Sequence, residues 1–348
     1  MRRVLISSIW GALFLVIATS LFQHPTGGKR RLALDLTSES KVVLITYDDN
    51  NLDITTILTD VEFFRGTPTG KFIARKKDGT WLIGNYTDPK KTCRIDACLV
   101  PENSIEATVD NAGNRIIWVT RDNRFKLLLT NLNSKKTSQI RSNTGVLYCP
   151  SWSPDDRKIT FYSGLSLYAD RYTMSSLELM EIPAEIGTHT NNVEWLVKEI
   201  APHSFQHEYS GSRMIDPQWS PDGQWILFSA CYSYQDNITQ YYVKIDGTGL
   251  FPTSGMGPHG WSSDSKGIYS LLTQDHLHFK PTLVDIKTHI ENDNSFIKKM
   301  PFQMILSWEP RGDYFIMQGD TVNLLNMHTG QYRELCDADD SYLVYWEK

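Results

Sequence analysis

A short motif recurs along this chain and constrains its fold more than any other feature. Its clearest copies read SWSPDD at 151–156, QWSPDG at 218–223, WSSD at 261–264 and WEPRG at 308–312, and degenerate copies precede them near 67–73 and 110–116. The positions aligned with the motif tryptophan are Gly66, Val109, Trp152, Trp219, Trp261, Trp308 and Trp346. Their spacing is close to the period of about 40–45 residues of β-propeller blades, except between 152 and 219.

Each copy has a direct local interpretation. An apolar strand ends at the tryptophan, Pro-Asp-Gly supplies a tight turn, and an alternating strand such as 158–161 follows. Proline fixes φ for the turn, and glycine or aspartate tolerates the positive φ that the turn needs. Two further strands follow in each repeat, for example 124–130 and 137–141. Four strands per repeat predict an all-β protein, a β-propeller of four-stranded blades.

The two ends of the chain predict how the ring closes. Residues 342–346 read as an inner strand with nothing after it, and 31–36, 42–47 and 52–58 supply three strands at the other end. If these segments share one blade, the ring closes and its exposed edges disappear. We expect seven blades, with six or eight as the alternatives.

The motif resembles the Trp-Ser-Pro-Asp-Gly repeats of the TolB family, a WD-like kind of propeller also present in prolyl-oligopeptidase-type peptidases. The resemblance covers roughly residues 31–348 and implies the fold, not an activity. TolB itself has six blades and a separate N-terminal domain that has no counterpart here. The peptidases need a hydrolase domain with a Gly-x-Ser-x-Gly elbow, and the sequence contains no such string.

The N-terminus predicts export. Met1-Arg2-Arg3 precedes an uncharged apolar run at 4–22, the pattern of a signal peptide. A run of this length also suffices for a membrane anchor. We therefore expect a signal peptide or N-terminal membrane anchor at 1–22, a linker at 23–30 and the propeller at 31–348. The predicted location is extracytoplasmic: periplasmic, on the cell surface or secreted.

Charge and cysteine content exclude some functions. The net charge of −5 and the pI of about 6.0 argue against a nucleic-acid partner. The five cysteines are too few for a disulfide scaffold and have no zinc-ribbon spacing. Cys93 and Cys98 are close enough in sequence to form a bridge in an oxidising compartment, with two free thiols as the alternative.

A set of histidines is the only metal-like pattern. Connections between second and third strands, and those between blades, emerge on one face of a propeller. Six residues with ligating side chains are expected there, near the mouth of the channel: His203, His207, His259, Gln274, His276 and His278. Such ligands suit a divalent transition metal. The set faintly resembles oligogalacturonate lyases, seven-bladed propellers whose manganese is held by histidines and a glutamine.

Large aromatic residues gather in the same connections. Extra residues between Phe161 and Trp219 lengthen two loops, at 163–175 and 201–213, and the next blade adds a third aromatic loop. The aromatic residues are Tyr168, Tyr172, Phe205, Tyr209, Tyr232 and Tyr234. Loop aromatics are amphipathic anchors for sugars, peptides or proteins.

Two hypotheses follow. The first is a non-enzymatic propeller that needs no cofactor and binds a partner protein or ligand through its aromatic loop face. The second is a metal-dependent lyase or hydrolase that acts on a carbohydrate through the histidines at the channel mouth, with manganese as the cofactor that the resemblance implies.

Overall fold

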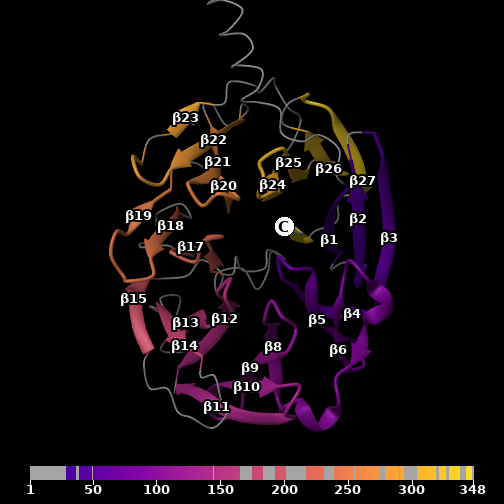
Figure 1. Ribbon diagram of the computed structural model, residues 1–348, viewed down its shortest axis with the longest axis vertical. Coiled ribbons are helices and arrows are strands. Elements are labelled where there is room, and N and C mark those ends of the chain that lie inside the picture. Colours follow the sequence, from indigo (N-terminus) through magenta and orange to yellow (C-terminus); the bar gives the residue numbers. More distant parts are fainter. Residues whose placement is uncertain are drawn as a thin grey trace, which may run out of the picture.

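The chain forms a ring of seven four-stranded antiparallel sheets in a computed structural model (Figure 1). The structure describes residues 29–36, 39–48, 50–143, 145–164, 175–182, 193–200, 217–230, 239–253, 256–273, 279–289, 291–293, 304–318, 321–326, 329–337 and 342–346. Helical structure in these ranges is limited to two short 3-10 turns, η1 (Pro89–Lys91) and η2 (Ala97–Leu99). The prediction of an all-β propeller with seven blades is therefore confirmed.

Each blade runs from an inner to an outer strand in hydrogen-bonding order. Blades 1 to 4 consist of β28 (Tyr342–Trp346), β1 (Arg30–Leu36), β2 (Lys41–Tyr47) and β3 (Leu52–Thr59); β4 (Val61–Gly66), β5 (Lys71–Lys76), β6 (Trp81–Asn85) and β7 (Cys93–Arg94); β8 (Ser104–Val109), β9 (Arg115–Arg121), β10 (Phe125–Asn131) and β11 (Lys136–Asn143); and β12 (Val146–Trp152), β13 (Lys158–Gly164), β14 (Ser175–Glu181) and β15 (Val193–Ile200). Blades 5 to 7 consist of β16 (Gln218–Trp219), β17 (Trp225–Ala230), β18 (Thr239–Lys244) and β19 (Phe251–Pro252); β20 (Met256–Trp261), β21 (Gly267–Thr273), β22 (Phe279–Asp285) and β23 (Glu291–Asp293); and β24 (Met304–Trp308), β25 (Tyr314–Gln318), β26 (Thr321–Asn326) and β27 (Tyr332–Asp337).

Blade 1 joins the two ends of the chain, as the sequence predicts. β28 pairs antiparallel with β1, from Leu32 opposite Trp346 to Leu36 opposite Tyr342. β1 then pairs with β2, and β2 with β3. The closure makes the last described strand the innermost strand of a blade whose other three strands come from the first residues of the domain.

The motif tryptophans join neighbouring blades. The indole of Trp219 donates to the carbonyl of Ser151 at 3.1 Å, and that of Trp261 to the carbonyl of Gln218 at 3.0 Å. Trp346 repeats the arrangement with the Ser307 hydroxyl at 2.8 Å. Each indole thus buries its apolar body and finds an acceptor on the preceding inner strand, which is what a buried tryptophan requires. The hydrophobic clusters likewise lie between adjacent blades.

The turn after each tryptophan has one repeated geometry. Six equivalent positions, one in each of blades 2 to 7, adopt a positive φ between 60° and 82°: Gly70, Gly113, Asp156, Gly223, Ser265 and Gly312. The hydroxyl of Ser220 donates to Asp222 at 2.6 Å and accepts from the amide of Trp225 at 2.9 Å. Ser153 and Ser262 make the same pair of bonds in their own turns. These residues therefore shape turns, as the repeat predicts.

Candidate functional site

Loop connections on one face of the ring define the candidate site. In blades 2 to 7 the first and second strands meet at the repeated turn, so the second-to-third and blade-to-blade connections lie on the opposite face. We call this opposite face the loop face. The strand ends that bound the connections 165–174, 201–217 and 231–238 of blades 4 and 5 lie on it, whereas the second-to-third connections of the other blades are shorter, at 37–40, 77–80, 122–124, 274–278 and 319–320. Among the blade-to-blade connections, 201–217 is the longest, followed by 294–303 and 95–103.

The predicted aromatic residues belong to these long connections. Tyr168, Tyr172, Phe205, Tyr209, Tyr232 and Tyr234 lie outside the described residues, so their use in binding stays a prediction. The strands that flank them are described. β13 ends at Gly164 and β14 begins at Ser175, while β17 ends at Ala230 and β18 begins at Thr239. These described strand ends lie on the loop face of two adjacent blades.

The structure describes only one of the six predicted metal ligands. His203, His207, Gln274, His276 and His278 lie outside the described residues. His259 lies on the inner strand β20 and is only 3% exposed. Its Nε2 is 2.8 Å from the Ser270 hydroxyl, and its amide donates to Gln240 Oε1 at 3.1 Å. Within the described ranges no three His, Cys, Asp or Glu side chains are grouped as ligands of one metal ion.

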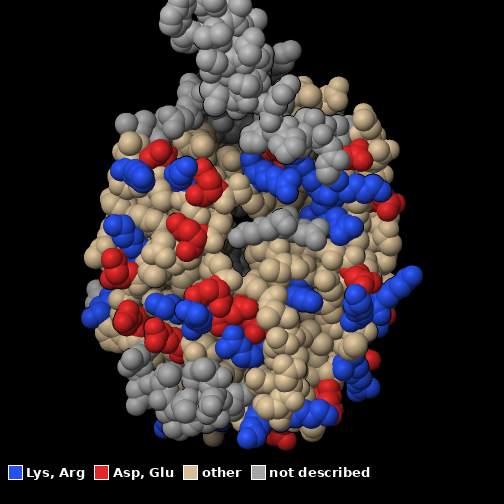
Figure 2. All heavy atoms as spheres, in the orientation of Figure 1, with Lys and Arg blue, Asp and Glu red and all other residues tan. Residues whose placement is uncertain are grey.

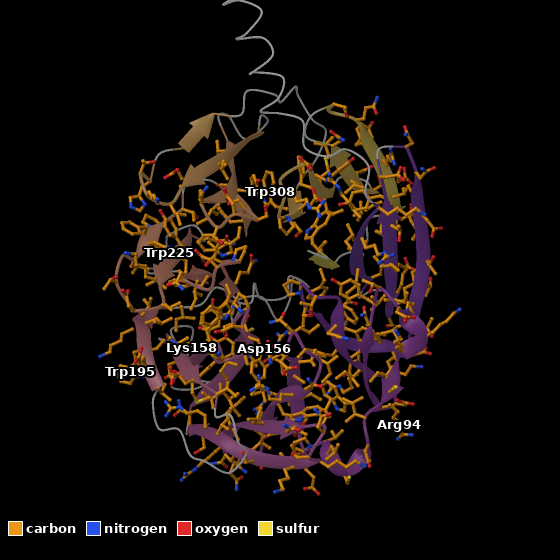
Figure 3. All side chains as sticks on the ribbon, viewed as in Figure 1. Arg94, Asp156, Lys158, Trp195, Trp225 and Trp308 are labelled. Atoms are coloured by element: carbon orange, nitrogen blue, oxygen red, sulfur yellow. The ribbon has the colours of Figure 1, made fainter. Side chains whose placement is uncertain are left out.

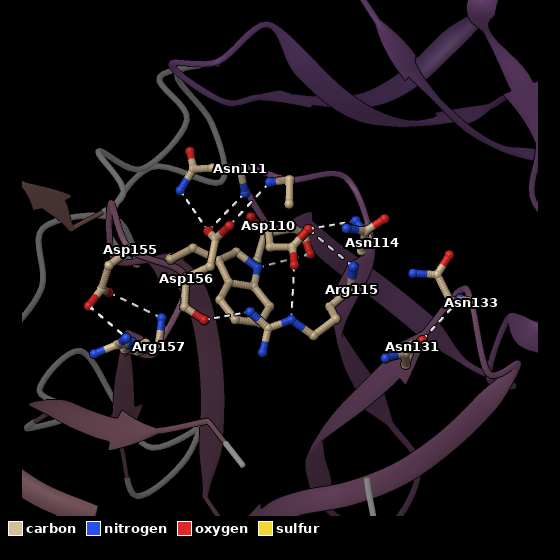
Figure 4. A network of polar contacts seen from close by, with 12 residues as sticks. Asp110, Asn111, Asn114, Arg115, Asn131, Asn133, Asp155, Asp156 and Arg157 are labelled. Carbon is tan, nitrogen blue, oxygen red and sulfur yellow. Dashed lines mark hydrogen bonds and ion pairs between the residues drawn. The ribbon is translucent and has the colours of Figure 1, made fainter. Parts of the chain in front are cut away.

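The turn face, by contrast, is occupied by bonds between blades (Figure 4). Asp156 of blade 4 accepts from the amide of Asn111 at 2.9 Å and from that of Ala112 at 3.1 Å, both in the turn of blade 3. Arg115 returns a bond to the Asp156 carbonyl at 2.5 Å and pairs with Asp110 at 2.9 Å. Burial raises the pKa of Asp156 above its ordinary value, although these amide hydrogen bonds oppose the shift.

A second polar cluster crosses the inner strands of blades 2 to 4. Arg65 on β4 forms an ion pair with Glu106 on β8 at 2.5 Å, and the amide of Cys149 on β12 donates to the other Glu106 oxygen at 3.0 Å. Register shifts in β8 and β12 fall at these positions, and Cys149 has a φ of 51°. β-Bulges often re-aim side chains near binding sites. Sequence reasoning missed this cluster because its members come from three separate repeats.

Charged side chains of both signs lie on the face of the ring that Figure 2 shows. Figure 2 shows acidic and basic side chains interspersed over the face in view and around the central opening. This mixture agrees with the net charge of −5.

The remaining predictions concern cysteines and the N-terminus. Cys93 and Cys98 are both exposed thiols without a bridge between them. The predicted signal peptide or anchor at 1–22 and most of the linker lie outside the described residues. Neither of the 3-10 turns in the described ranges is long or apolar enough to cross a membrane.

Similar architectures occur among solved structures, although the sequence matches no family model and no curated protein. A puromycin-hydrolyzing peptidase of Mycobacterium tuberculosis is 12% identical, with a TM-score of 0.55 over 87% of this chain and 51% of the peptidase. An oligogalacturonate lyase in complex with manganese is 11% identical, with a TM-score of 0.51 over 90% of this chain and 87% of the lyase. TolB from Acinetobacter baumannii is 15% identical, with a TM-score of 0.47 over 95% of this chain and 69% of TolB.

These likenesses define a class of protein. The strand order, the closure of blade 1 and the similarity to the peptidase and the lyase identify a seven-bladed β-propeller. At 11–15% identity the likeness shows the fold alone. Because propellers carry many unrelated functions, the function has to be argued from the site.

Proposed function

We propose that this protein is an exported or membrane-anchored β-propeller that binds a partner protein or ligand through the loop face of blades 4 and 5, without catalysing a reaction. The observation that carries the proposal is the asymmetry of the ring. The turns between first and second strands repeat from blade to blade, whereas the two longest second-to-third connections, 165–174 and 231–238, and the longest blade-to-blade connection, 201–217, all belong to blades 4 and 5.

The bonding of the turn face supports the choice of the loop face. Turn residues such as Asp156 and Ser265 bond to the turn of the preceding blade, Ser265 through its hydroxyl to the Asp222 amide at 2.9 Å. Groups already paired within the ring are poor candidates for recognising a partner. Loops raised on a rigid scaffold are where binding residues concentrate, and large aromatic residues lose little entropy on binding.

The proposed location rests on the N-terminal sequence. The two arginines ahead of the apolar run at 4–22 match an export signal. Cleavage of this segment gives a periplasmic, surface or secreted protein, and retention gives one anchored by a single segment. Fractionation of the native cells, followed by N-terminal sequencing of the mature chain, distinguishes these outcomes. A protein found only in the cytoplasm contradicts the proposal.

Crosslinking in the native cells tests the binding itself. A photoreactive group placed at Phe205 or Tyr209, on the loop face, is expected to capture a partner. The same group at Gln224, an exposed residue of the repeated turn, is expected to capture none. Equal capture from both positions contradicts the assignment of the faces.

The metal-dependent carbohydrate lyase or hydrolase is the second candidate. It rests on the predicted histidine set and on the resemblance to the manganese-containing lyase. His259, the one described member, is buried and bonded to Ser270, which is the usual position of a structural histidine. Metal analysis of the purified protein separates the two candidates. A stoichiometric transition metal that is lost in His276→Ala favours the enzyme, and the binding proposal predicts no such metal.

A further inference from the structure

Trp195 differs from every other described tryptophan. It lies on β15, the outer strand of blade 4, at the rim of the ring (Figure 3). Its side chain is 55% exposed, whereas the other tryptophans within the described ranges are buried or half-buried. Exposing so large an apolar ring forfeits the free energy of its burial, which is substantial for an aromatic side chain. A tryptophan this exposed on an outer strand therefore invites a functional explanation.

A β-bulge follows Trp195 on β15. Glu178 on β14 pairs with Trp195, but the preceding residue Leu177 pairs with Val197, so Leu196 is an extra residue on β15. As a result Leu196 and Val197 both face the core, at 6% and 7% exposure. The residues on either side of them, Trp195 and Lys198, both point to solvent. Bulges are a recognised means of aiming side chains at a binding site.

The bulge also orders the indole. Lys198 Nζ lies 4.3 Å from the centroid of the Trp195 ring, a distance at which a cation is attracted to the ring face. Regular alternation along a strand would place residues 195 and 198 on opposite faces of the sheet. The extra residue thus brings an ammonium donor beside the ring and restricts the orientation of both.

Blade 5, the neighbouring blade, forms the other side of a depression next to Trp195. The turn between β18 and β19 carries Asp246 and Gly247, and together with β15 it encloses a depression of about 410 Å³. Gly247 has a φ of 76°, and an added Cβ would lie 3.8 Å from the Leu196 carbonyl oxygen. Asp246 Oδ1 is held by the amide and the hydroxyl of Thr248 at 2.9 and 2.6 Å. The carboxylate is therefore fixed in orientation. Glu194 adds a second exposed carboxylate.

We propose that this depression between blades 4 and 5 is a binding site for a neutral saccharide. An exposed indole offers a flat apolar surface for the carbon face of a pyranose ring. Glu194 and Asp246 offer acceptors for sugar hydroxyls, and Lys198 offers a donor. The volume lies in the range of small-ligand sites. Two carboxylates against one ammonium disfavour an anionic sugar, so the site takes neutral saccharides rather than uronates.

The site is separate from the proposed partner surface. Trp195 lies on an outer strand, whereas the predicted aromatic anchors belong to connections of the loop face. The saccharide proposal therefore does not depend on the proposed function. Phe205→Ala with Tyr209→Ala is expected to leave saccharide binding unchanged, so the two proposals succeed or fail independently.

Saturation-transfer difference NMR on the full mature protein tests the proposal. The probes are cellotriose, triacetylchitotriose and maltotriose as neutral trisaccharides, and trigalacturonate as the anionic comparison. We expect saturation transfer to at least one neutral trisaccharide, weakened about tenfold or more in Trp195→Ala because the stacking surface is lost. Asp246→Asn, which keeps the shape of the side chain, is expected to weaken binding as well.

Tyr332→Ala is the matched control. Tyr332 is 60% exposed on β27, the outer strand of blade 7, and its removal is expected to leave binding unchanged. Absence of transfer to all three neutral probes overturns the proposal, as does binding of trigalacturonate alone or binding that Trp195→Ala leaves unaltered. Capture of a protein through Trp195 without saccharide binding assigns the depression to a protein partner and also overturns it.

Discussion

The guanidinium of Arg30 donates to both carboxylate oxygens of Glu309, at 3.0 and 2.8 Å, across 279 positions of the sequence. Its second terminal nitrogen reaches Asp313 at 2.7 Å, and the group lies 4.9 Å from the centroid of the Tyr314 ring. Glu309 occupies the place that serine holds in the other clear motif copies with proline. Where the ring joins its two ends, an ion pair therefore binds β1 to the turn of blade 7.

Loss of this ion pair is expected to destabilise the ring. Arg30→Ala leaves two carboxylates, with side-chain exposures of 6% and 9%, without their cation. Removing one partner of a largely buried pair strands the other charge in a poorly solvated place. We expect a loss of about 2 kcal/mol or more in the free energy of unfolding, measured by urea denaturation. Arg124→Ala, at an exposed position, is the control and is expected to change it by no more than about 0.5 kcal/mol.

The effect of Arg30→Ala is expected to depend on pH. Burial raises the pKa of Glu309 above its usual value, with Arg30 opposing the shift. A carboxyl whose folded-state pKa is raised stabilises the protein below its unfolded-state pKa, and this contribution is lost as the pH rises through the folded-state value. Without Arg30 the pKa of Glu309 rises further. The difference between the two proteins should thus be small in acid and grow toward neutral pH. A difference that stays constant with pH contradicts this explanation.

The shared blade makes a prediction for truncation. Deleting residues 341–348 removes β28, its pairing with β1 and the bond from Trp346 to Ser307. The exposed edge of β1 is then expected to cause aggregation. Deleting residues 347–348 alone, beyond the end of β28, is the control and should leave the protein soluble. Light scattering and thermal melting report both; a soluble 341–348 deletion with unchanged melting rules out the shared blade.

In two of the six repeated turns the residue with positive φ is not glycine but Asp156 or Ser265. Substitution of Asp156 tests the reason. Its φ of 60° favours glycine, yet its carboxylate accepts two amide bonds from the turn of blade 3. Hydrogen bonds to a charged group contribute about 1.5–3 kcal/mol each, more than the roughly 1 kcal/mol that glycine gains there. We expect Asp156→Gly to lower the free energy of unfolding by about 1–3 kcal/mol.

Lys135 provides the matched comparison for that substitution. It is exposed, has a φ of 54°, and lies in the turn between β10 and β11. Lys135→Gly relieves the same backbone strain at an exposed position, and it should leave stability unchanged or raise it by up to about 1 kcal/mol. If both substitutions change stability by the same amount and sign, the carboxylate of Asp156 does not hold the turns of blades 3 and 4 together.

Most of the fold could be predicted from the sequence because each copy of the repeat specifies local structure. Tryptophan, proline, aspartate and glycine in fixed order specify a strand end and a turn, and each blade repeats them. The closure of the ring could be predicted because 342–346 forms a single strand that needs three partner strands to complete a blade. The contacts of Arg30 with Glu309, and of Arg65 with Glu106, join residues of different blades, and a motif that describes one blade contains no signal for them.

The candidate sites were less predictable because they also depend on contacts between separate strands. The placement of Trp195 and Lys198 on the same side of β15 depends on one extra residue in β15 relative to β14, and pairing register is invisible in a single strand. His259 looked like a metal ligand in the sequence, but its environment comes from Gln240 and Ser270 on neighbouring strands. The aromatic residues of the long connections remain predictions.

The central claim is that the loop face of blades 4 and 5 recognises a partner, and one measurement tests it most directly. Capture of the crosslinked partner is compared for the wild-type protein, Phe205→Ala with Tyr209→Ala, and the turn-face control Gln224→Ala, with a melting curve for each. We expect the double variant to lose at least about 1 kcal/mol of binding free energy with little change in melting, and Gln224→Ala to bind as wild type. Full capture by the double variant, or loss of the partner in Gln224→Ala, contradicts the claim.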